Sequence, residues 1–574
     1  MNNLNLSIET ELSGSRIILE AFLQEGIHTV FGYPGGAIIP IYDALYDYKE
    51  QLEHILVRHE QAAVHAAQGL ARVSGKVGVV MATSGPGATN LVTGLADALL
   101  DNTPLVCITG QVFEHLLGTD AFQEIDVMNV TSPVTKWNYQ VTDANELPEV
   151  LAKAFYIARS GRPGPVLIDV TKNAQLQKVP YKGYSPCHSL RSYKPDPVPS
   201  MECIEQAADL INNAERPFII AGQGIMLGEA EEEFLQFAEK SGIPIAWTVL
   251  GMGAVPTDHP QAVGMVGMHG NYGPNILTNQ CDVLIAVGMR FDDRVTGRLD
   301  QYAKQAKIIH LDIDKAEINK NVKVDVPVLG NCKETLPLIT TFINKREHSD
   351  WHQKFKDCLE VESINLINDE LHPTEEEITM GEVIRYLNEI TMGEAVIVTD
   401  VGQHQMVTCR YSSFKNSRTN ITSGGLGTMG FCLPAAIGAA YGKRNLPVIA
   451  VMGDGGAQMN IQELGTVMQY HPDIKILILN NSYLGMVRQW QELFHEERYS
   501  FVDIQSPDFV QVAKGYSISG RKVVQREELE VALREMLDHK GAFLLEVMTG
   551  KKHNVFPMIP QGKSVSEIVL NHKQ

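Results

Sequence analysis

The alternation of apolar and polar positions is clearest between Val448 and Asn481. The runs Val448–Met452 and Ile474–Leu479 are short, apolar and rich in β-branched residues, as expected of strands buried on both faces. Between them, apolar residues recur at helical spacing, at Ile461, Leu464, Val467 and Met468. The pattern predicts a βαβ unit with a right-handed crossover, which places the turns after both strands at one edge of a parallel sheet. Asp454 and Asn481 would then lie side by side.

The same alternation runs through the rest of the chain. Apolar strands are predicted at VFGYPGG, VGVVMATSGPGATN, PLVCITGQV and PGPVLIDV, and then at PFIIAG, PIAWTVL, DVLIAVGMRF and KIIHLDID. We therefore predict an α/β protein with three tandem parallel-sheet domains, at residues 1–177, 201–343 and 378–574. A proline-rich linker is expected at 178–200, and a charged connector with an exposed helix at 344–377.

Length and charge narrow the class of protein. A chain of 574 residues is too long for one core, and the length suggests about three to four domains. The net charge of −20 argues against a nucleic-acid or anionic-membrane partner. No apolar run is long enough for a membrane span, and Met1–Ser15 lacks the basic and apolar regions of a secretory signal. Eight scattered cysteines without a C-x-x-C pair predict reduced thiols in a cytoplasmic protein.

The turn after the strand at Val448–Met452 carries the first candidate chemistry. The Asp454 carboxylate and the Asn481 amide oxygen are hard ligands that suit a Mg²⁺ ion sharing oxygens with a phosphate group. Glycines at 453, 455 and 456 allow the backbone to approach a diphosphate and offer N–H groups at a helix start. No Gly-Lys-Ser/Thr follows, so this is not a P-loop. The simpler alternative is a glycine turn with an ordinary surface acid.

The combination of Gly-Asp-Gly and Asn-Asn resembles the signature of thiamine-diphosphate enzymes. The stretches VGQHQ (Val401–Gln405) and SGGLGTMG (Ser423–Gly430) are similar to further motifs of that family. The resemblance implies the pyruvate-oxidase-like fold, in which the first and last of three domains hold the cofactor across a dimer interface. It implies a thiamine-diphosphate site at Glu60, Val401, Gly402, Gln403, His404, Gly427, Met429, Gly453, Asp454, Gly455, Gly456, Asn481, Gly485 and Met486. It places Mg²⁺ on Asp454, Asn481 and the backbone carbonyl of Tyr483.

Three of these residues have roles that only the resemblance implies. Glu60, in VRHEQAAVHAAQGLAR, would hydrogen-bond the aminopyrimidine ring and drive deprotonation of the thiazolium C2, while Met429 would bend the cofactor. From the residues alone, Glu60 is a solvated charge favoured by the helix dipole, and His404 is a hydrogen-bonded histidine at a strand end. Met429 would similarly be core packing.

Four further stretches resemble the large catalytic subunit of the acetohydroxyacid (acetolactate) synthase family. They are FGYPGGA, GTDAFQE, GMRFDDRVTG and LGMVRQW, and the likeness extends from about Ser13 to Gly562. The resemblance implies decarboxylation of pyruvate and transfer of the hydroxyethyl unit to a second pyruvate or to 2-oxobutanoate. The products would be 2-acetolactate and 2-aceto-2-hydroxybutanoate, in the first common step of branched-chain amino-acid biosynthesis. The implied catalytic residues are Glu60, Gly36, Phe122, Gln123, Lys172, Arg294, Met429, Met486 and Trp490.

Two of these side chains would select the acceptor. The planar fork of Arg294 would pair with the acceptor carboxylate, a bidentate task that suits arginine better than lysine. Trp490 would form an apolar wall that senses a methyl or an ethyl group, a difference worth about 1–3 kcal/mol. The simpler alternatives are an ion pair of Arg294 with Asp292 or Asp293, and a core position in a helix for Trp490.

The middle domain has glycines and an acid at strand ends, which are features of dinucleotide sites, although the full G-x-G-x-x-G fingerprint is absent. The resemblance assigns this domain to FAD, in a structural role. The implied contacts are Arg162, Gly222, Gly224, Thr248, Gly267, Met268, His269, Gly288, Arg290, Asp292, Arg294, Asp312, Ile313 and Asn331. Catabolic acetolactate synthases lack the RFDDR stretch and the flavin. Several positions depart from the family pattern, namely Phe113, Thr171, Asn173, Asn331, Val407 and Cys432.

Other functions remain as alternatives. A related thiamine-diphosphate enzyme, such as a pyruvate oxidase or a catabolic acetolactate synthase, is one. A catalytically dead nucleotide-binding regulatory subunit is another, and the presence of Glu60, Asp454, Asn481, Arg294 and Trp490 weighs against it. The resemblance further implies a homodimer or homotetramer, and a separate small regulatory subunit as partner.

Overall fold

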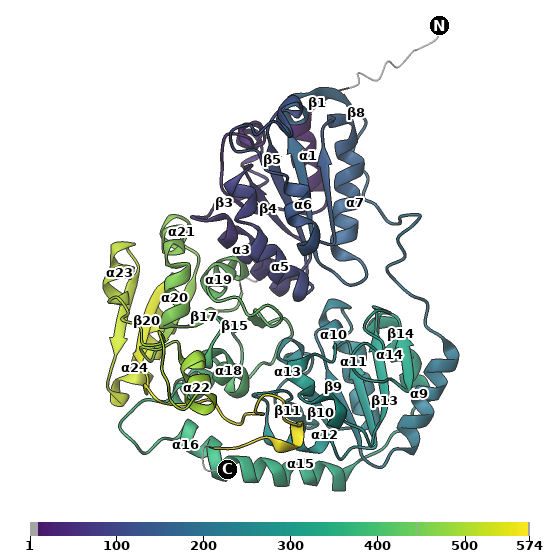
Figure 1. The fold of residues 1–574 in the computed structure, drawn as a ribbon, viewed down its shortest axis with the longest axis vertical. Coiled ribbons are helices and arrows are strands. Elements are labelled where there is room, and N and C mark those ends of the chain that lie inside the picture. The colour runs from purple at the N-terminus through teal and green to yellow at the C-terminus, as the bar shows by residue number, and fades with distance from the viewer. Residues whose placement is uncertain (1–9, 443–444, 572–574) are drawn as a thin grey trace.

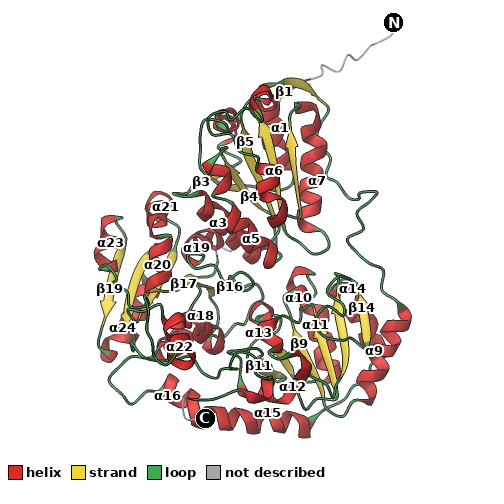
Figure 2. Ribbon diagram, in the orientation of Figure 1, coloured by secondary structure: helices red, strands yellow, loops and turns green. Residues whose placement is uncertain are grey.

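The fold is that of a computed structural model, which describes residues 10–442 and 445–571. Three six-stranded parallel sheets, each covered by helices, lie at the corners of a triangle (Figures 1 and 2). The predicted α/β class with three parallel sheets is therefore confirmed. Residues 1–9, at the start of the first predicted domain, and residues 572–574, at the end of the third, lie outside the described residues.

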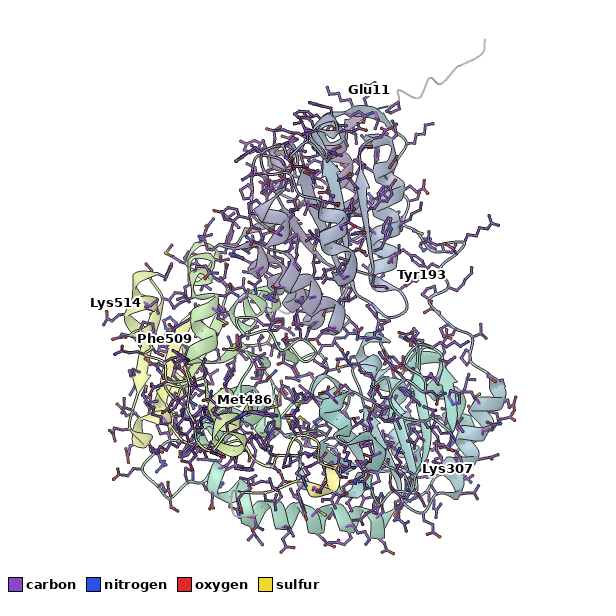
Figure 3. All side chains as sticks on the ribbon, viewed as in Figure 1. Glu11, Tyr193, Lys307, Met486, Phe509 and Lys514 are labelled. Carbon is purple, nitrogen blue, oxygen red and sulfur yellow. The ribbon has the colours of Figure 1, made fainter. Side chains whose placement is uncertain are left out.

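The first unit contains the strands β2 (Thr29–Gly32), β3 (Glu53–Leu56), β4 (Gly78–Ala82), β5 (Leu105–Gln111), β6 (Trp137–Val141) and β7 (Pro165–Thr171). Its helices are α1 (Gly14–Gln24), α2 (Ile39–Leu45), α3 (Glu60–Ser74), α4 (Pro86–Thr89), α5 (Val92–Leu100), α6 (Val127–Thr131), α7 (Leu147–Arg159) and α8 (Lys172–Leu176). The first four residues of the predicted linker form β8 (Lys178–Tyr181), which pairs antiparallel with β1 (Thr10–Ser13). The linker continues along this unit, where the Tyr193 hydroxyl (Figure 3) donates to the Ser160 carbonyl at 3.0 Å.

The middle unit contains the strands β9 (Pro217–Ala221), β10 (Ile245–Trp247), β11 (Ala262–Met265), β12 (Val283–Val287), β13 (Lys307–Asp312) and β14 (Val326–Leu329). Its helices are α9 (Met201–Asn213), α10 (Gly224–Leu227), α11 (Glu231–Ser241), α12 (Tyr272–Thr278), α13 (Asp293–Thr296) and α14 (Cys332–Phe342). The central strands β9 and β12 are buried along their whole length, because helices cover both faces of the sheet.

The third unit contains the strands β15 (Val396–Thr399), β16 (Asn420–Thr422), β17 (Val448–Gly453), β18 (Ile474–Asn480), β19 (Ser519–Val523) and β20 (Phe543–Met548). Its helices are α17 (Met380–Thr391), α18 (Gln403–Tyr411), α19 (Cys432–Gly442), α20 (Asp454–Met459), α21 (Leu464–Tyr470), α22 (Gly485–Phe494), α23 (Phe509–Gly515) and α24 (Leu529–Asp538). The predicted βαβ unit is present, since β17 and β18 pair in parallel.

Strand order distinguishes the middle sheet from the other two. The first sheet runs β3-β2-β4-β5-β7-β6 and the third β16-β15-β17-β18-β20-β19, so they share one topology. The middle sheet runs β11-β10-β9-β12-β13-β14, the doubly wound order typical of dinucleotide-binding folds. In such sheets, ligands bind at the carboxyl edge where the strand order reverses. The reversal points lie between β2 and β4, between β9 and β12, and between β15 and β17.

Two segments cross from one unit to another. The predicted connector forms α15 (Ser349–Glu362), which runs beneath the middle unit, then a π-helical turn and α16 (Asn368–Leu371), which lies below α22 of the third unit (Figure 1). The connector helix was expected to be exposed, but α15 buries Trp351 and Phe355 against Phe218. The C-terminal segment also returns to the middle unit, where the Ile559 N–H donates to the Met268 carbonyl at 2.9 Å. Within the described ranges, no helix has the length and apolar character needed to cross a membrane.

Helices α3 and α19 hold the first and third units together. They cross so closely that a Cβ atom added at Gly69 would overlap the Ala435 carbonyl, and one added at Gly438 would overlap the Ala66 carbonyl. Small residues on both helices permit this approach, and the crossing is buried. The relative position of the two units therefore depends on glycine at these crossing points.

We expect Gly438→Ala to destabilise the protein by about 1–3 kcal/mol, because the added methyl group overpacks the crossing. The midpoint of thermal unfolding measures the effect. Gly515→Ala is the matched control, since a Cβ at Gly515, at the end of α23, would meet nothing within 4 Å apart from its chain neighbours and the backbone of its own helix. Equal midpoints for the two variants would contradict the close crossing.

Candidate active site

A small cavity of about 50 Å³ lies at the reversal point between β15 and β17. The loops after β15, β17 and β18 enclose it, at the carboxyl edge of the third sheet. Its lining contains most of the predicted thiamine-diphosphate residues, namely Val401, Gly402, Gln403, His404, Met429, Gly453, Asp454, Gly455, Gly456, Asn481, Tyr483, Gly485 and Met486. Parallel pairing of the strands is the reason that residues so far apart in the sequence meet here.

Asp454 is almost fully buried in this cavity, with 1% of its surface exposed. Burial raises the pKa of its carboxyl to about 6, against the hydrogen bonds that it accepts. The Ser506 hydroxyl donates to its Oδ2 at 2.8 Å, and the backbone N–H of Asn481 also donates to it. Asp454 and Asn481 therefore lie together as the βαβ pattern predicts. A cation bound beside Asp454 would stabilise the ionised form of its carboxyl group.

The walls of the small cavity have no room for larger residues. A Cβ at Gly453 would lie 2.8 Å from His404 Nδ1, and one at Gly485 would overlap the Gln403 amide. His404 is buried, and burial lowers its pKa to about 4. Its Nε2 has no hydrogen-bond partner among the described residues. An unpaired polar atom in a glycine-lined cavity points to a polar ligand, and the negative charge of a diphosphate would favour the protonated, donating imidazole.

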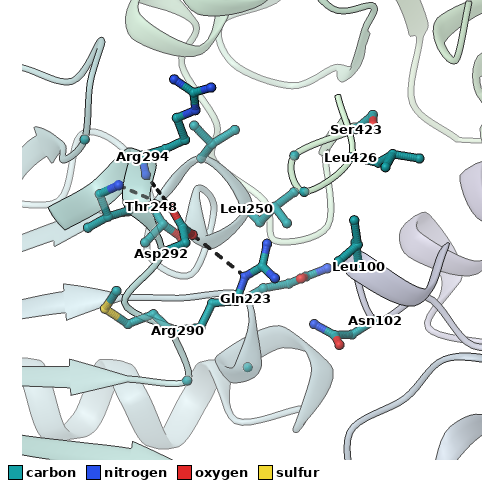
Figure 4. Close-up of a pocket in the computed structure, with 18 of the residues that line it drawn as sticks. Leu100, Asn102, Gln223, Thr248, Leu250, Arg290, Asp292, Arg294, Ser423 and Leu426 are labelled. Carbon is teal, nitrogen blue, oxygen red and sulfur yellow. Dashed lines mark hydrogen bonds and ion pairs between the residues drawn. The ribbon is translucent and has the colours of Figure 1, made fainter. Parts of the chain in front are cut away.

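A second cavity of about 910 Å³ opens at the reversal point between β9 and β12 (Figure 4). It is lined by the predicted FAD residues Arg162, Gly224, Thr248, Gly267, Met268, His269, Gly288, Arg290, Asp292, Arg294, Asp312, Ile313 and Asn331. Gly222 is not in the lining, because it packs on the Gly288 carbonyl and leaves no space for a Cβ. His269 Nε2 is a second buried ring nitrogen without a partner in the described chain.

The first unit forms one wall of this large cavity. Leu100 and Asn102, at the end of α5, face Gln223 and Arg290 in Figure 4. Arg162 donates to Asn102 Oδ1 at 2.6 Å and to Glu317 Oε1 at 2.6 Å, so it ties the first unit to the middle one. Residues of all three units therefore line the cavity, and its volume of about 910 Å³ is within the usual range of small-molecule and cofactor sites.

The two cavities meet at the residues that they share, which are Val401, Gly402, Met429, Met486 and Val487. Met486 (Figure 3) begins α22 on the side of the third unit that faces the middle one. Gly427, Arg294 and Trp490 line the large cavity close to this junction. The predicted diphosphate site therefore adjoins the cavity that holds the predicted acceptor residues and the predicted flavin site, and the shared residues line both cavities.

The arginine predicted to bind the acceptor is only weakly paired. Arg294 Nε lies 3.7 Å from Asp293 Oδ2, and both side chains are mostly exposed. The neighbouring Asp292 instead caps α13, accepting the N–H groups of Arg294 and Val295 at 3.0 and 3.2 Å. The simpler interpretation as an ion pair is thus present for Arg294 and Asp293, but it leaves the guanidinium accessible. Trp490 is half-buried on the cavity wall and contacts Phe494, with ring centroids 5.1 Å apart and the rings tilted by 52°.

Five predicted residues lie elsewhere. Among the described residues, neither cavity includes Gly36, Glu60, Phe122, Gln123 or Lys172. They follow the strands β2, β3, β5 and β7 at the carboxyl edge of the first sheet.

The turn after β4 contacts two of these five residues, and two others are hydrogen-bonded to each other. Asn90 donates to Glu60 Oε2 at 2.9 Å, and Gly85 packs on the Gln123 backbone. Lys172 Nζ donates to the Gly36 carbonyl at 3.1 Å. Phe122 is 88% exposed. The chain therefore carries two separate sets of predicted functional residues.

Sequence reasoning missed several side chains that support these sets. They are Asn90, which holds Glu60, Ser506, which holds Asp454, and Gln489, whose Oε1 accepts from Gln403 Nε2 at 2.9 Å. Asn90 ends the turn signal SGPGATN, so that motif could have indicated it. Ser506 and Gln489 have no comparable local signal.

Three family models match this chain in the order of its sheets. The model described as thiamine pyrophosphate enzyme, N-terminal TPP binding domain, matches residues 12–130. The central-domain model matches residues 204–339, and the C-terminal TPP binding domain model matches residues 400–547. These matches define the class of protein as a thiamine pyrophosphate (thiamine diphosphate) enzyme.

Curated relatives match over almost the whole chain. A probable acetolactate synthase large subunit of Methanocaldococcus jannaschii is 44% identical, covering 97% of this chain and 95% of its own. The acetolactate synthase isozyme 2 large subunit of Escherichia coli is 43% identical, covering 97% and 99%. The acetolactate synthase large subunit of Lactococcus lactis is 42% identical, covering 99% of this chain and 98% of its own. The chain belongs to the acetolactate synthase large-subunit family.

The Asp292 cap yields a prediction about the turn that carries Arg294. Asp292→Ala should make the amide hydrogens of Arg294 and Val295 exchange faster, since loss of an N-cap costs about 0.5–2 kcal/mol. Hydrogen exchange followed by mass spectrometry measures it. Asp293→Ala is the matched control, because the Asp293 carboxylate is 84% exposed and lies against the Arg294 side chain. If both variants exchange alike at these amides, the capping role of Asp292 is wrong.

Proposed function

We propose that this chain is an acetolactate synthase. It decarboxylates pyruvate and transfers the two-carbon hydroxyethyl unit to a second pyruvate or to 2-oxobutanoate, forming 2-acetolactate or 2-aceto-2-hydroxybutanoate. These are the first common products on the way to valine, leucine and isoleucine. The observation that carries the proposal is that the small cavity with Asp454 shares Val401, Gly402, Met429, Met486 and Val487 with the large cavity that Arg294 and Trp490 line, in a chain of this family.

The small cavity is the proposed site of Mg²⁺ and of the diphosphate group of thiamine diphosphate, supported by its buried acid, its glycine-lined walls and the unpaired Nε2 of His404. When bound, the cofactor supplies the acidic C2 carbon and the electron sink that decarboxylation of a 2-oxo acid requires. Asp454, Asn481 and the Tyr483 carbonyl would supply hard oxygen ligands, which Mg²⁺ prefers and shares with diphosphate oxygens. Gln403 and His404, with the glycines at 453, 455, 456 and 485, would hold the diphosphate. Met429, at the junction of the two cavities, would support the bend between the two rings, and Gly427 would accept from the pyrimidine amine.

FAD is the group proposed for the large cavity. Support comes from the strand order of the middle sheet, from the size of the cavity and from the unpaired Nε2 of His269. Arg162 and Arg290 offer positive charge to a diphosphate, and Asp312 ends β13 at the same edge. The flavin would be structural, because acetolactate formation requires no net oxidation.

The chain's own side chains would select and orient the acceptor. The accessible guanidinium of Arg294 can take a carboxylate with two parallel hydrogen bonds. Trp490 and Met486 form an apolar wall beside it, which suits the methyl or ethyl group of a 2-oxo acid. The acceptor would therefore lie between the flavin side and the thiamine side of the large cavity.

A second copy of the chain would complete each site. The residues Glu60, Gly36, Phe122, Gln123 and Lys172 lie on the first unit outside both cavities, and the exposed Phe122 ring has apolar surface to cover. We therefore propose a homodimer in which the first unit of one copy faces the third unit of the other. A homotetramer would consist of two such dimers. A small regulatory subunit is proposed as a further partner of this large subunit.

A product assay tests the proposed function. Purified protein is given pyruvate, thiamine diphosphate, Mg²⁺ and FAD, with and without 2-oxobutanoate and a cognate small subunit. We expect both acetohydroxy acids, without oxygen uptake. Oxygen consumption with acetate or acetyl phosphate as product would favour a pyruvate oxidase. Full synthase activity in flavin-free protein would favour the catabolic type, and no turnover of pyruvate would favour a regulatory protein.

Asp454→Asn tests the metal assignment. The variant should bind thiamine diphosphate in Mg²⁺ about tenfold or more weakly, because a neutral amide replaces the charged oxygen ligand. The thermal midpoint of the cofactor-free protein should not fall, since the ionised form of a buried acid is costly. Asp503→Asn is the matched control on the adjacent segment, where Asp503 is mostly exposed and pairs with Lys551 at 3.3 Å. Unchanged affinity in Asp454→Asn would overturn the assignment.

A further inference from the structure

Glu463 is a buried acid that the proposed chemistry does not use. It is fully buried in the 3₁₀ turn η8 (Ile461–Glu463), directly before α21 in the third unit. Its Oε1 accepts the backbone N–H of Arg58 at 2.9 Å, and the carboxylate also accepts the N–H of His59. The Thr466 hydroxyl donates to Oε2 at 2.7 Å. Burial raises the pKa of Glu463 to about 7, because the ionised carboxylate loses its hydration. The hydrogen bonds from these donors offset part of that cost.

The backbone held by Glu463 directly precedes Glu60. Residues Val57–His59 connect β3 to α3, and Glu60 is the first residue of α3. Further hydrogen bonds connect this segment to the third unit. The Arg58 guanidinium donates to the Gly465 carbonyl at 2.9 Å and to Gln469 Oε1 at 2.8 Å, while the Leu56 N–H donates to the Tyr470 hydroxyl at 2.9 Å. The third unit therefore holds the segment that leads to Glu60, from Leu56 at the end of β3 to His59, by hydrogen bonds.

The direction of the Glu60 side chain depends on where α3 begins. His59 caps the helix with an extended backbone, and its Nδ1 accepts the Gln61 N–H at 3.1 Å. Asn90 is the side chain that contacts the Glu60 carboxylate itself. Asn90 can orient a carboxylate, but it cannot fix the backbone from which that carboxylate projects. The hydrogen bonds from Arg58 and His59 to Glu463 do so.

We propose that Glu463 is a positioning residue for Glu60. The Glu463 carboxylate fixes the two peptide groups that precede α3 and thereby sets the position at which the Glu60 carboxylate meets the cofactor. The inference rests on the proposed function, in which Glu60 contacts the pyrimidine ring of thiamine diphosphate. The position of an acid that shares a proton is a stringent requirement, since a misplacement of about 1 Å can cost about a hundredfold in rate.

A purely structural role would give different behaviour. The same contacts bridge the first and third units, so loss of Glu463 would then lower stability without a selective effect on Glu60. Two variants separate the roles. Glu463→Asp keeps the charge but withdraws it by one methylene group from the Arg58 and His59 N–H groups. Glu463→Gln loses the charge but keeps a carbonyl oxygen within reach of both donors.

The readout is the exchange of the thiazolium C2 proton of bound thiamine diphosphate with deuterium, measured by acid quench and NMR without any substrate. Glu463→Asp should slow this exchange by about tenfold or more, and Glu463→Gln by less than about threefold. Both should bind thiamine diphosphate and Mg²⁺ with affinities close to that of the wild type, because Asp454 and the diphosphate loops are unchanged. In cofactor-free protein, the amides of Arg58 and His59 should lose hydrogen-exchange protection in Glu463→Asp alone.

Glu382→Asp is the matched control. Glu382, on α17, is also a buried acid of the third unit, with 3% of its surface exposed. Its Oε2 lies 3.1 Å from Arg526 Nε. The control should lower the thermal midpoint and leave C2 exchange unchanged. Wild-type exchange in Glu463→Asp, or equal slowing in Glu382→Asp, would overturn the positioning role. If the wild-type protein does not accelerate C2 exchange relative to free thiamine diphosphate, the proposed function itself fails.

Discussion

The close crossing of α3 and α19 is the constraint on which the arrangement of this protein depends. Gly69 and Gly438 allow the two helices to touch through their backbones, so the first and third sheets cannot shift independently. Both helices begin at predicted functional segments: α3 begins at Glu60, and α19 follows the glycine-rich loop that carries Met429. A structural contact outside the linings of both cavities thereby fixes the position of two predicted functional segments. Glu463 adds a second fastening at the beginning of α3.

Topology accounts for the location of the chemistry. Parallel strands place their following loops at one edge, and the reversal of strand order opens space between two of those loops. The third sheet places Asp454 and His404 at such a point, and the middle sheet places Gly224 and Gly288 at another. The first sheet has the same strand order as the third, yet its loops carry Glu60 and Lys172 outside both cavities. Its set of residues is thus available to a neighbouring chain.

Much of this could be predicted from the sequence, because buried parallel strands leave a strong local pattern. The runs at β17 and β18 indicated that Asp454 and Asn481 would meet, and the structure places them together. Short strands such as β11 and β16, with four and three residues, show no usable period and were not predicted. The burial of one face of α15 was missed, because its charged stretch has few apolar residues, among them Trp351 and Phe355. Contacts such as that between Arg58 and Glu463 join residues about four hundred positions apart, and no local pattern encodes them.

The central claim of this account is that one chain carries two separate halves of a site and that a second copy joins them. Mixing Glu60→Gln with Asp454→Asn tests it most directly, at a thiamine diphosphate concentration that saturates the wild type but supports no activity in Asp454→Asn alone. In a symmetric dimer formed at random, half of the molecules are mixed and each of these has one intact site, so about a quarter of wild-type acetolactate synthesis should return. If the mixture, refolded or coexpressed so that chains exchange, is no more active than either variant alone, the two halves do not join across copies and the account is wrong.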